Sequence, residues 1–475
     1  MDQREAPLAK ALTGMRDRNY VPFDVPGHKC SLSFLNDYFG EKCVALDFNS
    51  RKDIDYLCDP RGVILDAERL AADAFGAKDA FFMTGGTTSA VQAMVMSVCA
   101  PGDKIVLPRN VHYSVIYAVI LSGAIPVYLN PFVHKSIGIS LGPDLKDIET
   151  AIDSNSGVKA IFVNNPTYYG ICSDLSSIVK VAHRKGIKVL VDEAHGTHFY
   201  FHNELPLGAM QCGADLSAIS MHKTGGSLTQ SSILLSSGNV PRDHIENTIN
   251  LTRSTSASYL LMASLDLARR NLALNANGAM ERIIAMCQKT RNAINGMGPY
   301  YAFSKDIIDG RYVYDFDVTK LSVNTAALGL AGIEVYTLLR DRYHIQVEFG
   351  DMCNFLAVST IADTQDAHDR LVLALSDIAQ REQGRAIRYS YEYITPDVVM
   401  TPREAFYGAK KTVKITDACN KISGVSIMCY PPGIPLLAPG ERITSTIVDY
   451  IRYAAEKGCS VTGLLDGDSI LVLSE

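Results

Sequence analysis

The feature that most constrains the fold is a regular alternation of short apolar runs with helix-like runs between about residues 75 and 235. The strand-like runs are 80–84, 104–108, 125–129, 160–164 and 187–191, and the helix-like runs between them include 87–99, 112–122 and 173–185. Strands separated by helices of this length form βαβ units, in which the strands run parallel. The alternation therefore predicts an α/β fold with a mostly parallel, doubly wound sheet.

The rest of the chain has a different texture. Near residue 300, strand-like runs at 315–323 and 344–350 flank a helix expected over 332–341, and residues 383–395 resemble a polar linker. We expect four parts: an N-terminal segment (1–55), a large domain (56–305), a small α+β domain (306–390) and a C-terminal domain (391–475). Ser173 is the expected N-cap of the helix over 173–185.

Composition excludes several classes of protein. The 475 residues are 47% hydrophobic and 20% charged, with a net charge of −6, which argues against a nucleic-acid-binding surface. We find no apolar run long enough to span a membrane and no signal peptide, so we expect no membrane partner. The eleven cysteines contain no Cys-x-x-Cys pair and are read as reduced thiols of a cytoplasmic protein.

The strongest chemical signal comes from the ends of two apolar runs. Asp192 ends Val-Leu-Val-Asp, and Lys223 follows Ser-Ala-Ile-Ser220 by three residues. Parallel sheets bind ligands at the carboxyl ends of their strands, where Thr84 and Asn164 are also expected. A carboxylate that keeps a pyridinium nitrogen protonated and a lysine that forms a Schiff base are what pyridoxal phosphate (PLP) requires of its host.

Gly85-Gly86-Thr87-Thr88-Ser89 lies between an expected strand and an expected helix. Free backbone N–H groups at a helix N-terminus, together with three hydroxyls, would bind a phosphate. A glycine-rich turn with a capping hydroxyl is the alternative, and the run alone does not decide between them.

Three other motifs are set aside. Asp192-Glu-Ala-His195 resembles a helicase motif, but the chain lacks the glycine-rich phosphate loop that such enzymes need. Ser220-Met-His-Lys223 and Lys223-Thr-Gly match two β-lactamase motifs. Those motifs are separate elements in β-lactamases, whereas here a single lysine would have to serve both. His195, His198 and His202 could suggest a metal site, but 198–202 alternates as a strand does, and Cys30, Cys43 and Cys58 are irregularly spaced. We therefore expect no metal.

The ordered series of motifs resembles the Orn/Lys/Arg decarboxylases, which are aspartate-aminotransferase-like (fold type I) PLP enzymes, and among them the short bacterial arginine decarboxylases. The resemblance covers nearly the whole chain through these runs: Pro26-Gly-His-Lys29, Asp59-Pro-Arg-Gly62, Gly86-Thr-Thr, Pro108-Arg-Asn-Val-His112, Asn165-Pro-Thr-Tyr168, Asp192-Glu-Ala-His-Gly196, Ser220-Met-His-Lys223, Gly226-Ser-Leu-Thr-Gln-Ser231, Thr401-Pro-Arg-Glu-Ala-Phe406 and residues 431–441.

The resemblance implies a role for each residue of the site. Lys223 would bind PLP as an internal aldimine, and Asp192 would pair with the pyridinium nitrogen, which keeps the ring an electron sink. His112 would stack on one face of the ring and Ala194 on the other, although His112 could instead cap its helix. Further cofactor contacts are expected from residues near the phosphate and the ring: Gly86, Thr87, Thr88, His195, Ser220 and His222.

The resemblance also suggests how the substrate is held. Glu441 is the candidate partner of the substrate's distal cation, with a solvated loop glutamate as the alternative. A homodimer or a larger even assembly, with the site at the subunit interface, is implied. Tyr113 and Cys58 depart from the residues common among relatives, which leaves the identity of the substrate open.

The favoured function is decarboxylation of a basic L-amino acid in polyamine biosynthesis, with arginine first, then lysine and ornithine. Lys223 or His222 would return a proton to Cα. The runner-up is another PLP reaction on a cationic amino acid, by an aminotransferase, lyase or oxidase. Aminotransferases usually clamp the α-carboxylate with an arginine, and the sequence does not show whether Arg109 or Arg403 could do so. A non-catalytic binding or regulatory protein is the third hypothesis.

Overall fold

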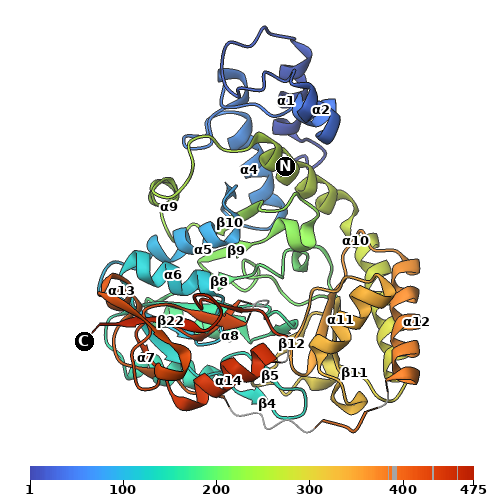
Figure 1. Ribbon diagram of the computed structural model, residues 1–475. Coiled ribbons are helices and arrows are strands. Elements are labelled where there is room, and N and C mark those ends of the chain that lie inside the picture. Colours follow the sequence, from blue (N-terminus) through green and yellow to red (C-terminus); the bar gives the residue numbers. More distant parts are fainter. Residues whose placement is uncertain (383, 388–392, 430–432, 457, 475) are drawn as a thin grey trace. The chain divides into compact units, whose positions relative to one another are not determined.

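The computed structural model describes residues 1–382, 384–387, 393–429, 433–456 and 458–474, which form two compact units. Unit 1 comprises residues 1–98 and 189–281, and unit 2 comprises residues 99–188 and 282–475. Helices and strands alternate along much of the chain (Figure 1), so the predicted α/β class is confirmed. The three boundaries between the four predicted domains stay a prediction, and the one at 390/391 lies outside the described residues.

Unit 1 contains four strands of the large sheet in the order β1-β10-β9-β8. The strands are β1 (Asp79–Met83), β10 (Ser232–Ser236), β9 (Leu216–Ile219) and β8 (Lys188–Asp192). β8 and β9 pair in parallel, whereas β10 runs antiparallel to both β9 and β1. The helical elements of this unit are α1 (Pro7–Asp17), α2 (Ser33–Phe39), α3 (Glu41–Val44), η1 (Lys52–Ile54), α4 (Val63–Ala74), α5 (Gly86–Met96), η2 (Phe199–Phe201), η3 (Met221–Gly225), α9 (Arg242–Asn250) and the first part of α10 (Tyr259–Asn295).

Unit 2 contains the other three strands of the large sheet, all parallel, in the order β6-β2-β3. β2 (Lys104–Pro108) and β3 (Ile125–Leu129) have the predicted bounds, and β6 (Val158–Asn164) begins two residues before the predicted start. The interior of β2 is fully buried, as expected for a strand with helices on both faces. The connecting elements are α6 (Tyr113–Ser122), β4 (Val133–His134), β5 (Ile139–Ser140), α7 (Leu145–Asp153), β7 (Ile171–Cys172) and α8 (Leu175–Arg184).

A smaller α+β region follows α10 in unit 2. Its antiparallel sheet has the order β11-β13-β15-β14, and α11 packs on β14 and β15 and beside α12 (Figure 1). A core that includes Leu321, Phe355 and Leu375 joins the sheet to both helices. The elements are β11 (Tyr301–Ala302), η4 (Lys305–Ile307), β12 (Asp315–Phe316), β13 (Lys320–Asn324), η5 (Ala326–Leu328), α11 (Gly332–Tyr343), β14 (Phe349–Gly350), β15 (Asn354–Val358) and α12 (Gln365–Arg381).

The C-terminal part of unit 2 has its own hydrophobic core, which includes Ile427, Leu437, Ile447 and Ile470. Short antiparallel pairs build it: β17 with β22, β18 with β19 and β21, and β16 with β20. The elements are β16 (Asp397–Val398), α13 (Pro402–Tyr407), β17 (Lys410–Lys414), η6 (Ile415–Asp417), β18 (Ile427–Cys429), β19 (Ile434–Leu437), β20 (Glu441–Arg442), α14 (Ser445–Glu456), β21 (Val461–Thr462) and β22 (Ser469–Leu473).

Three local predictions were wrong. α8 is capped by Asp174, whose side chain accepts a hydrogen bond from the Ser177 N–H at 3.1 Å, and not by Ser173. Residues 199–201 form a 3₁₀ turn rather than a strand, because apolar alternation over five residues does not exclude a tight helical turn. Within 344–350, only Phe349–Gly350 is a strand.

Among the described residues, no helix combines the length and the apolarity that crossing a bilayer requires.

Candidate active site

The N-terminus of α5 presents free backbone donors. Its N-cap is Gly85, which has no side chain to cap the helix, whereas α6, α7 and α8 are each capped by a side chain. Gly86 has φ +74°, a conformation that other residues adopt only with strain. Thr87 and Thr88 follow in the first turn, so the predicted run lies at a helix N-terminus, where the helix dipole favours an anion.

Three hydroxyls from three segments meet at this helix N-terminus. The Thr87 hydroxyl is hydrogen-bonded to the Ser220 hydroxyl and, at 2.8 Å, to that of Ser232. Ser220 follows β9 and Ser232 begins β10, so the two strands bring their hydroxyls to α5. Sequence reasoning found Thr87 and Ser220 but missed Ser232, which carries no motif of its own.

Asp192 is the last residue of β8 and stands opposite Ala218 of β9. Its carboxylate accepts a hydrogen bond from the Ala194 N–H at 3.1 Å. Burial raises the pKa of this carboxyl, while the charge of Lys223 acts in the opposite direction. The structure therefore brings the predicted carboxylate and the predicted lysine within electrostatic reach, and the buried Ala194 follows directly along the chain.

Lys223 lies in the middle of η3, a single π-helical turn that begins after Ser220 and ends at Gly225, and Gly226 follows it with φ +86°. Such turns are rare and often occur at functional sites. The Lys223 Nζ lies 2.9 Å from Nε2 of His195, in the loop after β8. The neighbouring His222 places Nδ1 3.0 Å from the carbonyl oxygen of Ser231.

A second carboxyl beside Asp192 was not identified from the sequence. Glu193 is fully buried and accepts hydrogen bonds from the Tyr200 hydroxyl at 2.6 Å, the Ser217 hydroxyl at 2.8 Å and the Ala209 N–H at 2.8 Å. Burial raises its pKa to about 8. Glu193 thus fixes the loop that carries His195.

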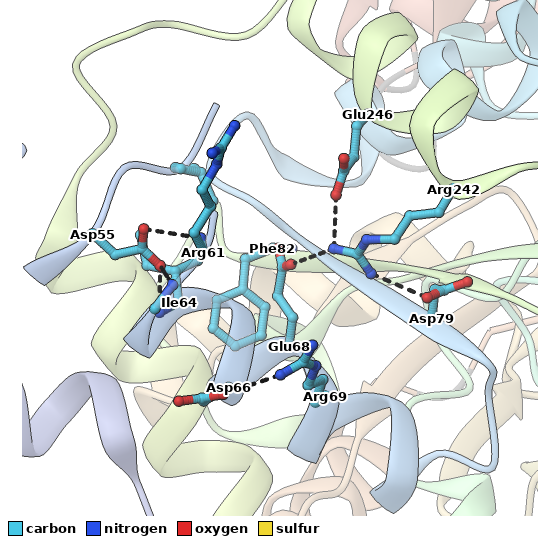
Figure 2. A network of polar contacts seen from close by, with 12 residues as sticks. Asp55, Arg61, Ile64, Asp66, Glu68, Arg69, Asp79, Phe82, Arg242 and Glu246 are labelled. Carbon is cyan, nitrogen blue, oxygen red and sulfur yellow. Dashed lines mark hydrogen bonds and ion pairs between the residues drawn. The ribbon is translucent and has the colours of Figure 1, made fainter. Parts of the chain in front are cut away.

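Side chains also support β1, the outermost strand of its sheet, which leads into Gly86. The Phe82 N–H donates to the buried Glu68 carboxylate at 2.9 Å, and the Phe82 carbonyl accepts from Arg253 at 2.8 Å. Figure 2 shows Arg242 placed among the carboxylates of Glu68, Asp79 and Glu246, at 2.8–3.1 Å. The same view shows Asp55 accepting backbone hydrogen bonds at the start of α4.

His112 belongs to unit 2, where it is the N-cap of α6. Its Nδ1 accepts from the Ser114 N–H at 3.2 Å and lies 2.8 Å from the Ser114 hydroxyl. The next residue, Tyr113, donates its N–H to the Gly433 carbonyl at 3.0 Å. The capping role is therefore present, and the stacking role stays a prediction. Gly433 belongs to the motif run 431–441, of which Pro431 and Pro432 lie outside the described residues.

Glu441, also in unit 2, is bonded to Arg109 and to the backbone of Ala438. Its carboxylate forms a bidentate ion pair with Arg109, with distances of 2.8 and 2.7 Å, and accepts from the Ala438 N–H at 2.6 Å. Arg109 also donates to the Pro435 carbonyl at 2.7 Å. The side chains are 1% and 0% exposed. The Glu441 carboxylate is thus buried and paired with Arg109, and its contact with a substrate cation stays a prediction.

Arg403 is used in a similar way. It donates to the carbonyls of Ile120 and Leu121 at the end of α6, both at 2.9 Å. Arg109 and Arg403 were the two arginines considered as clamps for a substrate α-carboxylate. In the structure, both instead fasten the C-terminal part of unit 2 to the ends of β2 and α6.

The unit 1 residues fit PLP by the chemistry of their donors. An uncapped helix N-terminus with hydroxyls suits a phosphate dianion, a buried carboxylate suits a protonated ring nitrogen, and a lysine amine suits an aldehyde. No cluster of three metal-ligating side chains occurs among the residues the structure describes.

Comparison with known proteins gives a consistent result over the whole chain. The family model described as Orn/Lys/Arg decarboxylase, major domain, matches residues 6–323, and the corresponding C-terminal domain matches residues 385–464. An arginine decarboxylase of Bacillus subtilis is 41% identical over 471 residues, covering 98% of this chain and 96% of the relative. An arginine decarboxylase of Halalkalibacterium halodurans is 40% identical, with 97% and 96% covered.

Solved structures agree on the fold. A lysine decarboxylase of Francisella novicida superposes with a TM-score of 0.85 at 22% identity, covering 98% of this chain and 81% of that one. An alanine–glyoxylate aminotransferase from Nostoc superposes with a TM-score of 0.53 at 14% identity, covering 69% and 89%. These likenesses confirm the aspartate-aminotransferase-like (fold type I) architecture.

Proposed function

Since the chain belongs to the Orn/Lys/Arg decarboxylase family, we propose that it is a PLP-dependent enzyme that converts L-arginine to agmatine. The similarity to relatives named arginine decarboxylase carries the choice of substrate, because it extends over 97–98% of the chain at 40–41% identity. The lysine decarboxylase of Francisella novicida, by contrast, is 22% identical. A place in polyamine biosynthesis follows from this product.

The donor set of unit 1 supports the cofactor assignment. Bound PLP would supply an electron sink for the pair of electrons left when carbon dioxide departs. Gly86, Thr87, Thr88 and Ser220 would hold its phosphate, and Asp192 would hold its ring nitrogen. Lys223 would carry it covalently and give way to the substrate amine, with His222 beside the phosphate, and His112 and Ala194 covering the ring.

The use of the arginines supports decarboxylation over the runner-up reactions. An enzyme that retains the α-carboxylate usually clamps it with a guanidinium, and a decarboxylase must let that group leave. Arg109 is committed to Glu441 and Pro435, and Arg403 to the end of α6. Both guanidiniums therefore have structural partners in this chain.

We also propose that the chain acts as a homodimer or a larger even assembly in the cytoplasm. A group of large apolar side chains within residues 20–39 is exposed, an arrangement typical of surfaces covered by another protein: Tyr20, Val21, Phe23, Val25, Leu32, Phe34, Tyr38 and Phe39. A second copy of the chain is the proposed partner. Seven described cysteines are free thiols, which is compatible with a reducing compartment: Cys30, Cys43, Cys58, Cys99, Cys287, Cys419 and Cys459.

Product analysis tests the proposal. The PLP-loaded protein is incubated separately with L-arginine, L-lysine and L-ornithine, and amine, carbon dioxide, keto acid and ammonia are measured. Agmatine with one equivalent of carbon dioxide is the expected result. Lys223→Ala should abolish it, and Lys185→Ala, at an exposed surface pair with Asp153, should not. Keto acid or ammonia without carbon dioxide would move the protein to the runner-up class.

A further inference from the structure

The contact between Lys223 and His195 joins two reactive side chains from consecutive loops. Nζ and Nε2 are 2.9 Å apart, within hydrogen-bond distance. His195 is 5% exposed, and the loop that carries it is fixed by the three hydrogen bonds to Glu193. Because His195 is buried and its loop is fixed, Nζ and Nε2 are held within hydrogen-bond distance with little access of water.

The chemistry of lysine requires such a neighbour. A lysine amine has a pKa of about 10.4 in water, so at neutral pH it is almost entirely the ammonium form, which has no lone pair for a carbonyl carbon. Asp192, the carboxylate within electrostatic reach, stabilises that charged form further. An imidazole, with a pKa of about 6.5, can accept the proton and return it at neutral pH.

Resting on the function proposed above, we propose that His195 is a catalytic residue that exchanges a proton with Lys223 whenever this lysine is not bound to the cofactor. The Nζ–H bond breaks as the Nε2–H bond forms, the amine keeps the electron pair, and nothing is oxidised or reduced. The lysine is free before cofactor loading and again in each turnover, after the substrate amine has replaced it.

The surrounding groups are compatible with this exchange. The Asp192 carboxyl of β8 is within electrostatic reach of Lys223, and in its ionised form it stabilises a proton on Nζ. His222 of η3 is directed at the Ser231 carbonyl, and Glu193 is engaged by Tyr200, Ser217 and Ala209. His195 contacts Nζ through its Nε2, and an imidazole can accept and return a proton at neutral pH.

The test measures the rate at which PLP attaches covalently to the cofactor-free full chain. The attachment is monitored through the absorbance of the lysine-bound cofactor, at pH values from 6 to 10.5. At pH 7, His195→Gln should slow attachment by about 10²-fold, the scale of general base catalysis, and the difference should vanish near pH 10.5. In His195→Ala, added imidazole should restore much of the rate. His202→Gln, a histidine substitution in the same loop but outside the site, is the matched control and should match the wild type.

A structural role for His195 would give a different pattern. Equal slowing at every pH, or no response of His195→Ala to imidazole, would overturn the proposal. Lys223→Ala is measured alongside: if it still acquires the same absorbance, then the proposed function itself fails. If Lys223→Ala loses the absorbance while His195→Gln behaves as the wild type, then only the role of His195 fails.

Discussion

Removing one partner of the buried Arg109–Glu441 pair should destabilise unit 2 far more than removing an exposed pair. Arg109 makes three hydrogen bonds of 2.7–2.8 Å with Glu441 and Pro435. The side chains of Arg109 and Glu441 are 1% and 0% exposed to solvent. In Arg109→Met, the Glu441 carboxylate stays buried without its counterion. The expected loss is about 3–5 kcal/mol in the free energy of unfolding.

The double variant Arg109→Met/Glu441→Met should recover much of this loss, because neither charge is then left alone in a dry environment. We expect the double variant to lose at least about 2 kcal/mol less free energy of unfolding than the sum of the losses in the two single variants. A coupling of this size is within the range seen for residues in contact. The coupling would show that the cost comes from the orphaned charge and not from lost packing.

The assay is urea unfolding monitored by circular dichroism. The matched control is an arginine on the strand that carries Glu441. Arg442 also belongs to β20 and pairs with Asp397 at 2.7 Å, but these side chains are 39% and 57% exposed. Arg442→Met should therefore cost about 0–1 kcal/mol. A loss in Arg109→Met no larger than in Arg442→Met would refute the reasoning, since it would mean that burial does not set the energy of this pair.

Three further predictions concern pH, the cofactor and assembly. Burial raises the pKa of Glu193 to about 8 and that of Glu68 to about 7. The folded state therefore binds more protons than the unfolded state, and the resulting stability, fully present below about pH 4.5, is lost as the pH rises through 7 and 8. Urea titrations from pH 5 to 8.5 should show the decline, and Glu193→Gln should flatten its upper part; a slope that is unchanged in this variant would contradict the assignment. Gly86→Ala imposes a side chain at φ +74° and should weaken PLP binding about tenfold, from a strain of 1–2 kcal/mol, in a spectroscopic titration. Its control, Gly102→Ala, likewise places a side chain at positive φ (+89°), is not among the residues proposed to bind PLP and should bind PLP normally. Phe23→Asp, at a side chain that is 95% exposed, should shift the protein toward a smaller species in light scattering, whereas an unchanged mass would remove residues 20–39 from the proposed interface.

Local patterns predicted the fold well where burial and period decide the structure. β2 and β3 have the predicted bounds because each is a five-residue apolar run between clear turn signals. The cap of α8 was misassigned because Ser173 and Asp174 are adjacent and both are good N-caps, so only the geometry distinguishes them. Asp192 and Lys223 were expected to lie near each other because they stand at or just after the ends of neighbouring parallel strands, and the structure places them within electrostatic reach.

Partnerships between distant segments could not be predicted. Arg109 and Glu441 are separated by 332 positions, and nothing in either segment indicates the other. For this reason the sequence suggested a substrate contact for Glu441 but gave no indication of its buried ion pair with Arg109. The π-helical turn at Lys223 and the burial of Glu193 were likewise invisible, because both depend on how neighbouring strands pack.

The way β1 is bordered has a consequence for folding and solubility. An outermost strand with the sequence Ala80-Phe-Phe-Met83 is a template for adding strands from other molecules, and such addition leads to aggregation. Here Glu68 and Arg253 occupy the outward N–H and carbonyl of Phe82. The two side chains that hold Phe82 in place thus also occupy the backbone groups that a strand from another molecule would need for pairing at this position.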